Sequence, residues 1–334
     1  MYIIDNYTIA VFLSFITMLC WGSWANTQKL SSKQWPFQLF YWDYSFGILL
    51  ITVVLAFTLG STGQDGRAFL EDLGQAESRY LGYALLGGII FNFANLLLVI
   101  AIEIAGMAIA FPIGIGIALV LGVITNYMFN PEGDPITLFA GVLFVMIAII
   151  LDAIAYKYIT KSEQETPLKG ILISLLAGVA MGFFYRYVAQ SMTTDFLVPE
   201  PGKLTPYTAL VVFSIGILLS NFVFNTVNMY RPISGNPVTY RNYFTLGNLK
   251  LHFIGWLGGA IWGIGMSFSI IASEQAGPAI AYGLGQGATL VAAFWGVFIW
   301  KELKDLPKSK NWLITAMFVC FIIGLALIIY SKVA

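Results

Sequence analysis

Ten long apolar stretches dominate this sequence of 334 residues. Each is about 20 residues long, which as an α-helix crosses the roughly 30 Å hydrocarbon core of a bilayer. Only helices and closed barrels satisfy their backbone inside lipid, and these stretches are too long for barrel strands. The sequence therefore predicts an all-α polytopic membrane protein with ten transmembrane helices. The expected spans are 7–28, 37–59, 80–102, 107–129, 136–157, 168–192, 207–229, 250–273, 277–300 and 311–331.

The composition agrees with this class and excludes others. Of all residues, 58% are hydrophobic and only 10% are charged, whereas soluble domains carry about 25% charged residues. An ordinary soluble enzyme, a nucleic-acid binder and a disordered protein are therefore excluded. The formal net charge is zero, which predicts no nucleic-acid partner. The expected partners are the lipid bilayer of the cell membrane, a small-molecule substrate and a proton, for a monomer or homodimer.

The sequence offers no catalytic, metal-binding or cofactor motif. His252 is the only histidine, which excludes a histidine-based metal cluster. Cys20 and Cys320 lie in apolar runs without CxxC spacing. The glycine-rich stretch Gly283–Gly287 lies inside an expected span with no strand before it, so it does not form a phosphate loop. We expect neither an enzyme nor an ATP-driven pump, and neither a cofactor nor a metal.

Basic residues indicate how the chain is inserted. The connections after odd-numbered spans hold twelve of the 17 basic residues, the opposite side holds four, and Arg186 lies inside a span. Because basic loops stay in the cytoplasm, the odd-numbered loops are expected to be cytoplasmic and both termini outside. The twelve residues are Lys29, Lys33, Lys157, Lys161, Lys169, Arg231, Arg241, Lys250, Lys301, Lys304, Lys308 and Lys310.

Two segments resemble each other at a constant offset of 171 residues. Residues 103–120 read EIAGMAIAFPIGIGIALV and residues 274–291 read EQAGPAIAYGLGQGATLV, with ten identities in 18 positions. The identities include Glu103 with Glu274 and Gly106 with Gly277. Chance matching of segments rich in glycine and alanine is the alternative explanation. Each segment lies at a turn between consecutive spans, which indicates an internal repeat.

A repeat of this kind divides the ten spans into two halves of five, residues 1–160 and 161–334. Because five is odd, the second half must insert with the opposite orientation to the first. Inverted repeats characterise secondary transporters, whose binding site lies near mid-membrane where the halves meet. The sequence thus predicts alternating access by movement of one half against the other.

Four segments carry a resemblance to a known family: the opening MYIID, Trp42–Ser45, Pro206–Ala209 and, most specifically, Ala276–Glu302, which reads AGPAIAYGLGQGATLVAAFWGVFIWKE. With them, most of the chain resembles the ureide permease family of the drug/metabolite transporter (DMT) superfamily. The resemblance implies ten helices in two inverted halves and proton-driven import of ureides or nucleobases such as allantoin or uracil. Similar plant proteins carry a long hydrophilic loop between helices five and six, which here is only about ten residues. That departure suggests a prokaryotic relative and leaves open whether its substrate is the same.

Two ionisable residues are expected inside the membrane, where a charge is costly and therefore a candidate for function. Asp43 lies about seven residues into the second span, and Arg186 about seven residues from the outer end of the sixth. Asp43 is interpreted as the carboxylate that couples transport to protons, with a hydrogen bond to a neighbouring helix as the alternative. Arg186 is a second coupling candidate, with extension toward the interface as its alternative. The two are expected at opposite depths.

Polar and aromatic residues within the spans are the expected substrate-binding residues. Amide side chains both donate and accept hydrogen bonds, which suits a neutral ligand with amide or ureide groups, and aromatic faces stack on flat rings. Interhelical hydrogen bonding and packing are the alternative roles. The residues are the amides Asn92, Asn95 and Gln286 and the aromatics Trp21, Tyr185, Trp262 and Tyr282.

Together these features predict a secondary active transporter of a small neutral polar solute, a ureide or nucleobase, that imports its solute with protons by alternating access. A sugar porter of the glucose, ribose and rhamnose type, which the same superfamily contains, is the first alternative. A metabolite or drug exporter of that superfamily is another.

Overall fold

The computed structural model of this chain describes residues 1–31, 35–105, 107–159, 168–233 and 236–334. Within them every regular element is helical apart from one isolated bridge between Met192 and Leu204. Ten helical spans are long and apolar enough to cross a membrane, and each overlaps one of the ten predicted ranges. The prediction of an all-α polytopic membrane protein with ten spans is confirmed.

Several spans consist of more than one helical piece. The spans are α1 (Tyr7–Ser23) with α2 (Ala25–Ser31), α3 (Phe37–Phe57) with α4 (Leu59–Thr62), α6 (Ser78–Ala105), α7 (Met107–Phe129), α8 (Pro135–Ile159), α9 (Leu168–Ser191), α10 (Pro206–Tyr230), α12 (Leu249–Ala276), α13 (Pro278–Gly285) with α14 (Ala288–Phe294) and the π-helix Trp295–Ile299, and α15 (Trp312–Tyr330). Two short helices, α5 (Phe69–Gln75) and α11 (Tyr240–Leu246), and the 3-10 turn Lys308–Lys310 lie in the connections.

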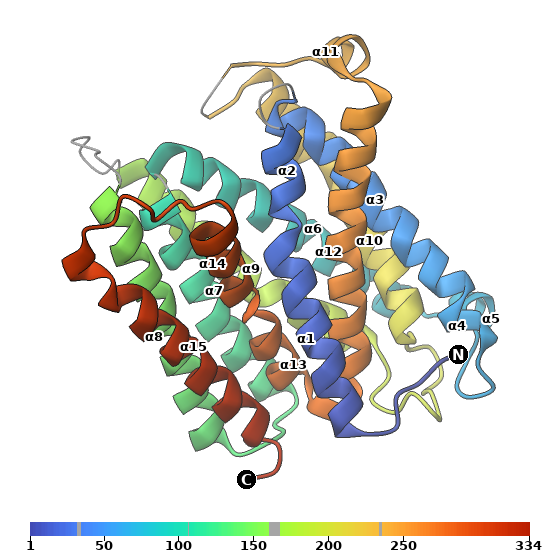
Figure 1. Cartoon of the computed structure of the whole chain (residues 1–334). Helices are drawn as coiled ribbons and strands as arrows, with labels where there is room; N and C mark the ends of the chain where they lie inside the picture. Colours follow the sequence, from blue (N-terminus) through green and yellow to red (C-terminus); the bar gives the residue numbers. More distant parts are fainter. Residues whose placement is uncertain (32–34, 106, 160–167, 234–235) are drawn as a thin grey trace.

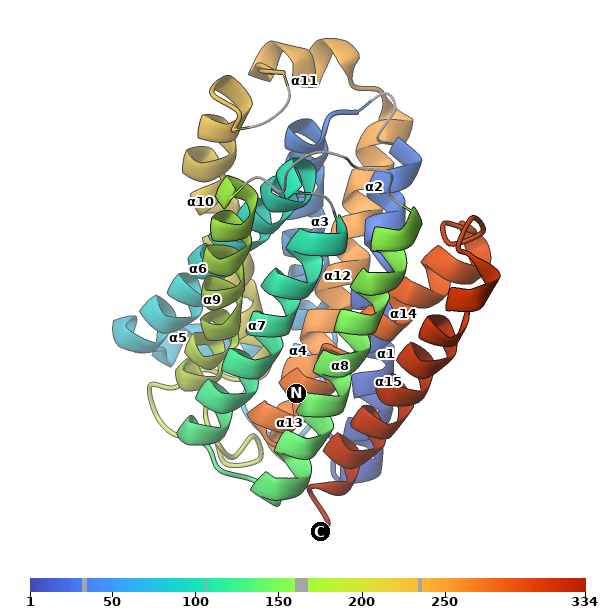
Figure 2. The same ribbon diagram turned by 90° about the vertical axis from the view of Figure 1, so that its left-hand side faces the viewer.

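The spans form one bundle with two distinct ends (Figures 1 and 2). The connections after odd-numbered spans, including α11, lie at the upper end in these views, which is called the odd-loop end below. The connections after even-numbered spans lie at the other end, the even-loop end, and both chain termini lie in that lower half. Which end faces the cytoplasm stays a prediction. Of the basic residues behind it, Lys33 and Lys161 lie outside the described residues.

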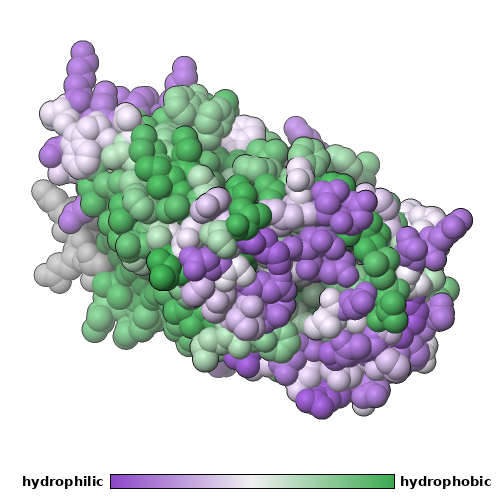
Figure 3. Space-filling view, turned by 90° about the horizontal axis from the view of Figure 1, so that it is seen from below, coloured by the Kyte–Doolittle hydropathy of each residue, from purple (hydrophilic) through white to green (hydrophobic). Residues whose placement is uncertain are grey.

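Large apolar side chains cover the outside of the spans. Hydrophilic residues gather on the even-loop end, and hydrophobic residues border them (Figure 3). Lipid tails are the only surroundings in which so much exposed apolar surface costs nothing. Examples spread over five spans are Phe12, Leu50, Leu143, Leu219 and Ile322, each at least half exposed.

Glycines let the central helices touch backbone to backbone. A Cβ atom at Gly259 of α12 would lie 1.9 Å from the carbonyl oxygen of Tyr44 on α3, and one at Gly88 of α6 would lie 2.0 Å from that of Phe213 on α10. Helices in lipid associate through such close packing, because no hydrophobic force drives them together. The two contacts therefore fix the α3–α12 and α6–α10 crossings.

The two crossings are related by the offset of the sequence repeat. Gly88 and Gly259 are 171 residues apart. A second pair of contacts joins the same helices: a Cβ at Gly216 would lie 2.3 Å from the carbonyl oxygen of Leu85, and one at Gly47 would lie 2.2 Å from that of Trp256. Leu85 and Trp256 are again 171 residues apart, and Gly47 and Gly216 are 169 apart. This spacing supports the predicted repeat, because one set of contacts is used twice.

Other helix pairs in contact are also related by a shift of five spans. α6 contacts α9, and the helices five spans away, α12 and α1, contact each other. In the same way α7 contacts α9, and α14 contacts α1. Glu103 lies near the odd-loop end of α6 and Glu274 near the even-loop end of α12. The inverted relation stays a prediction, as do the boundaries at 1–160 and 161–334. Gly106, one of the matched residues, lies outside the described residues.

We predict that Gly259→Ala destabilises the protein, because the new methyl group meets backbone that cannot move aside. Overpacking of this kind costs about 1–3 kcal/mol, which thermal unfolding in detergent measures as a lower Tm. Gly82→Ala is the matched control, since nothing lies within 4 Å of its Cβ position on α6. Equal Tm values for the two variants would show that the α3–α12 crossing does not depend on the backbone contact.

Candidate functional site

A cavity of about 220 Å³ lies between six of the spans, toward the odd-loop end. The lining residues of α1, α2, α6 and α14 belong to the parts of these spans that approach the odd-loop end, and those of α7 belong to its first turns. The lining residues are Trp21, Gly22, Trp24, Ala25, Gln28, Phe91, Asn95, Leu98, Val99, Ile102, Phe111, Ile115, Met181, Phe184, Trp262, Gln286, Ala288, Thr289 and Ala292.

Four of the seven predicted substrate-binding residues line this cavity: Trp21, Asn95, Trp262 and Gln286. The indoles of Trp21 and Trp262 are stacked, with ring centroids 5.8 Å apart and planes 12° from parallel. Phe91 packs against Trp262 at 4.3 Å between ring centroids. The cavity thus has a flat aromatic wall, on which a planar ligand can stack.

The cavity also offers polar groups that have no partner in the described part of the protein. The side-chain amide of Gln286 makes no hydrogen bond there, so its donor and its acceptor are both available. The indole N–H of Trp21 is buried without an acceptor. Asn95 donates through Nδ2 to the hydroxyl of Tyr41 at 3.0 Å, and its amide oxygen has no donor. Unpaired buried polar groups are costly unless a ligand pairs with them.

The glycine-rich run Gly283–Gly287 explains how Gln286 reaches the cavity. The ninth span is interrupted there, with α13 ending at Gly285 and α14 starting at Ala288. A Cβ at Gly285 would lie 2.7 Å from the ring of Trp21, so only glycine lets this indole pack against the helix. The break and the missing side chain together place the amide and the indole on one cavity wall.

Two predicted binding residues, Tyr185 and Tyr282, are fully buried and lie outside the cavity lining. Tyr185 donates to the carbonyl oxygen of Ser269 at 3.1 Å, and Tyr282 donates to that of Ala118 at 3.2 Å. The two rings pack against each other with centroids 5.3 Å apart. Because both hydroxyls bond to backbone of neighbouring helices, this tyrosine layer ties α9 and α13 to α12 and α7.

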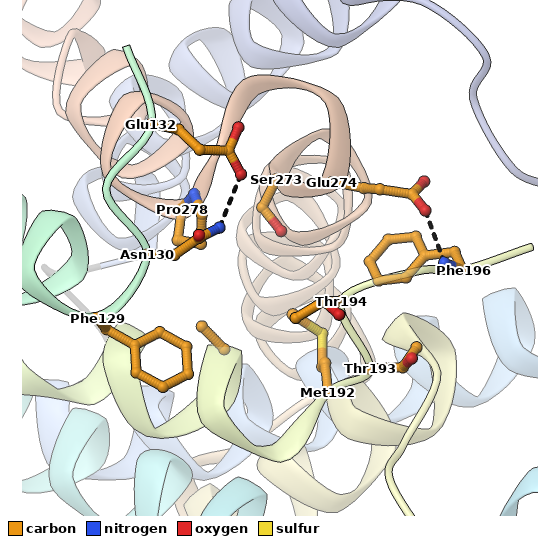
Figure 4. Close-up of a pocket in the computed structure, with 11 residues that line it drawn as sticks. Phe129, Asn130, Glu132, Met192, Thr193, Thr194, Phe196, Ser273, Glu274 and Pro278 are labelled. Carbon is orange, nitrogen blue, oxygen red and sulfur yellow. Dashed lines mark hydrogen bonds between the residues drawn. The ribbon is translucent and has the colours of Figure 1, made fainter. Parts of the chain in front are cut away.

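A second, smaller pocket of about 150 Å³ lies beyond that layer at the even-loop end (Figure 4). Along α9, Tyr185 stands between Phe184 of the cavity and Ala189 of this pocket. Along the ninth span, Tyr282 stands between Pro278 of the pocket and Gln286 of the cavity. The tyrosine layer therefore separates two openings that face opposite ends of the bundle.

Two glutamates belong to the lining of this second pocket. Glu274 accepts a hydrogen bond from the backbone N–H of Phe196 at 2.6 Å, and Glu132 accepts one from Asn130 at 2.7 Å (Figure 4). Glu132 also forms an ion pair with Lys332. Glu274 therefore ties the connection after α9 to the end of α12.

The remaining predicted residues Asn92 and Arg186 are not part of either opening. Asn92 is fully buried and donates to the hydroxyl of Ser220 at 2.9 Å, which links α6 to α10. Arg186 is half-buried in the even-loop half of α9 and makes no hydrogen bond or ion pair with the described residues. It is not paired with Asp43, in keeping with the opposite depths expected from the sequence.

Asp43 is fully buried at the centre of a hydrogen-bonded cluster near the odd-loop end. Its carboxylate accepts from the hydroxyl of Tyr243 at 2.5 Å and from the indole N–H of Trp35 at 3.2 Å. Nδ1 of His252 lies 3.0 and 3.1 Å from the two carboxylate oxygens. The cluster joins α3, the first connection, α11 and α12. Burial and the bond to Asp43 raise the pKa of Tyr243, so it stays a donor at neutral pH.

His252 gives this cluster a route to water. Its side chain is 21% exposed, whereas that of Asp43 is fully buried. An imidazole can accept a proton on one nitrogen and release another from the second. On the other side, Tyr41 lies two residues before Asp43 on α3 and accepts the hydrogen bond from Asn95, which lines the cavity. Sequence reasoning missed His252, Tyr243 and Trp35, because no spacing relates them to Asp43.

Ten spans around a cavity with unpaired polar groups, closed from the opposite end by an aromatic layer, define a membrane permease for small solutes. The chain belongs to the ureide permease family, whose family model matches residues 40–166 and 153–331. Members of this family are transporters and not enzymes.

The proteins similar to this chain come from plants and from bacteria. Ureide permeases 1 and 2 of Arabidopsis thaliana are each 23% identical to this chain, with 99% of each chain aligned. A putative sugar uptake protein of Streptococcus pyogenes serotype M6 is 24% identical over 74% of this chain and 77% of its own. A solved crystal structure with 13% identity covers 97% of this chain and 98% of its own with a TM-score of 0.59, which shows a shared fold.

We predict that a cysteine replacing Ala292, on the cavity wall, reacts with a small water-soluble thiol reagent. The matched control is Ala293→Cys, because Ala293 is 3% exposed and not part of the lining. Both are made after Cys20 and Cys320 have been changed to serine. Mass spectrometry of protein in nanodiscs measures the labelling rates, and equal rates at both positions would contradict the cavity wall.

Proposed function

We propose that this protein is a secondary active transporter that imports a small, neutral, planar solute with amide groups, a ureide or nucleobase such as allantoin or uracil, together with protons. The observation that carries the proposal is the unpaired amide of Gln286 beside the stacked indoles of Trp21 and Trp262 in one cavity. Ureides and nucleobases are flat and carry alternating N–H and C=O groups, which match both features. The names of the plant relatives support the same solutes.

Alternating access is the proposed route. The cavity and the second pocket open toward opposite ends, and the layer of Tyr185 and Tyr282 lies between them. In the described conformation the cavity lies on the odd-loop side, so the solute leaves or enters there. Movement of one half against the other, with exchange of the hydrogen bonds of the two tyrosines, would open the even-loop side. With the odd loops in the cytoplasm and the termini outside the cell membrane, this conformation faces inward.

Proton coupling is proposed to take place at Asp43. The carboxylate is buried, reaches water through His252, and lies on the helix that Asn95 contacts through Tyr41. A solute that takes the hydrogen bond of Asn95 releases Tyr41 and alters the packing of α3 around Asp43. Proton binding and solute binding are thereby linked through one helix. Arg186 stays a second coupling candidate, since it has no fixed partner among the described residues.

A sugar is the second candidate solute. Indole faces stack on sugar rings as they do on heterocycles, and the streptococcal relatives are named putative sugar uptake proteins. A metabolite or drug exporter of the same superfamily is a further alternative. Uptake of labelled allantoin or uracil into proteoliposomes, with and without an inward proton gradient, decides among them. Uptake that hexoses alone inhibit would favour a sugar porter, and outward pumping would favour an exporter.

We predict that Gln286→Ala and Asn95→Ala weaken solute binding about three- to tenfold, since each removes one hydrogen bond worth about 1 kcal/mol. Asn92→Ala is the matched control: it removes the same amide three residues away on α6, but from the contact with Ser220. It should lower the Tm and leave affinity unchanged. Solute-dependent thermal stabilisation across a panel of nucleobases, ureides and sugars measures both quantities. Unchanged affinity in both cavity variants would place the binding site elsewhere.

We predict that Asp43→Asn abolishes gradient-driven accumulation and leaves solute counterflow intact, because counterflow exchanges solute without net proton movement. The asparagine side chain retains one oxygen that can accept two hydrogen bonds, so the cluster around position 43 can stay assembled. Glu103→Gln, which changes an exposed carboxylate, is the control and should accumulate solute as the wild type does. Normal accumulation in Asp43→Asn would remove this residue from the coupling mechanism.

A further inference from the structure

A second carboxylate cluster lies apart from Asp43, where α8, α2 and the connection between the ninth and tenth spans meet. Glu302 forms an ion pair with Lys29 of α2 through Oε1 and accepts a hydrogen bond from the hydroxyl of Tyr156 of α8 through Oε2. One turn before Tyr156 on α8 is Asp152, whose Oδ1 is buried and has no hydrogen-bond partner among the residues that the structure describes. Asp152 and Glu302 are near enough for their charges to interact.

The backbone around Glu302 is unusual in three respects. The ninth span ends in the π-helix Trp295–Ile299, and π-helical turns occur frequently at functional sites. Lys301 has a φ of 52°, which is uncommon for any residue other than glycine and is the single such case in the described residues. At Gly296, an added Cβ would lie 2.6 Å from the Tyr156 hydroxyl and 3.0 Å from Oε2 of Glu302. The backbone next to Glu302 is thus strained at Lys301, and at Gly296 the absence of a side chain leaves room for the Glu302 carboxylate.

The strained segment is held in place by apolar packing. Leu303, Leu306 and Leu313 form a small cluster of their own with Ala155 of α8, and Tyr156 packs against it. A strained turn that is fixed by its surroundings points to a function and not to a loop that the fold tolerates.

The same segment is also joined to the cavity wall. Trp295 donates to the hydroxyl of Ser23 at 2.9 Å, and Trp300 donates to Oδ1 of Asn26 at 2.6 Å. The ammonium group of Lys29 lies 4.2 Å from the centroid of the Trp300 ring. These contacts bind the end of the ninth span to the end of the first, and Trp24, Ala25 and Gln28 between them line the cavity. A change at Glu302 therefore acts on that wall.

Charge balance defines what the cluster can hold. Among the described residues, the charged side chains of this cluster are the two carboxylates and the ammonium group of Lys29, which pairs with Glu302. Burying a charge without a partner is costly. A single proton on Asp152 makes the group of Asp152, Glu302 and Lys29 neutral. Within the described ranges, Tyr156 on α8 is a further titratable side chain in contact with Glu302. The ammonium group of Lys310 lies over the ring of Tyr158.

We propose that Asp152 and Glu302 form a proton-binding carboxyl pair, separate from Asp43, in which Asp152 holds the proton in the described conformation. Glu302, with a side chain 31% exposed, is the member that exchanges protons with water at the odd-loop end. A proton moves from water to the Glu302 carboxylate and on to Asp152, and departs by the reverse route. When the proton is on Glu302, its ion pair with Lys29 is lost and the wall between the first and ninth spans is released. This role in gating rests on the proposed transport function, whereas proton binding does not.

Infrared spectroscopy of the protein in nanodiscs at neutral pH tests the proposal without solute or gradient, because a protonated carboxyl group absorbs separately from a carboxylate. Asp152→Asn is expected to lose one protonated-carboxyl band that Asp43→Asn and Asp134→Asn retain. Asp134 is a suitable control, because it accepts hydrogen bonds from Thr137 in an exposed N-terminal cap of the same helix, and asparagine also caps well. Glu302→Gln is expected to keep the band and shift its frequency, since the neighbouring group changes.

An undiminished band in Asp152→Asn, or no such band in the wild type, would overturn the proposal. If Asp152→Asn does not fold, Glu302→Gln decides alone, and an unshifted spectrum counts against the pair. Failure of uptake in the transport assay leaves this result untouched, so the proton pair and the proposed transport function fail separately.

Discussion

Backbone contact between helices is the constraint on which this structure depends. In lipid, helices gain little by burying apolar side chains against one another, because lipid tails are equally apolar. They therefore associate through close packing. Gly88 and Gly259 permit this by lacking a side chain where the carbonyl oxygens of Phe213 and Tyr44 lie. The resulting crossings, α6–α10 and α3–α12, form a scaffold. The first, fourth, sixth and ninth spans pack against it, and together they enclose the cavity.

The polar groups of this scaffold fall into two kinds. The first kind donates hydrogen bonds to neighbouring helices and holds the bundle together, as Asn92, Tyr185 and Tyr282 do. In the described part of the chain, the amide of Gln286 and the indole N–H of Trp21 have no hydrogen-bond partners, and both lie where the ninth span is broken. Only the second kind is free to recognise a solute. The difference between them is one of position: the second kind lines the cavity, whereas the amide oxygen of Asn92, although it also lacks a donor among the described residues, lies outside the lining.

The ten spans were predictable from sequence because a membrane imposes length and apolarity on each helix independently of the others. Asn92 and Asn95 show where such prediction ends. Both are amides on α6, three residues apart, yet one faces Ser220 and the other the cavity. Only the position of α10 tells them apart. The pairing of Asp43 with His252 likewise depends on how α3 crosses α12, a three-dimensional relation between residues 209 positions apart.

The break at Gln286 has a mechanical consequence. α13, on one side of it, carries Tyr282 and belongs to the layer that closes the even-loop side, whereas α14, on the other side, carries Ala292 and belongs to the cavity wall. The two short helices meet at the break between Gly285 and Ala288, and this break bears the amide offered to the solute. A solute bound to this amide would contact the junction of α13 and α14 directly, so its binding would affect both the tyrosine layer and the cavity wall.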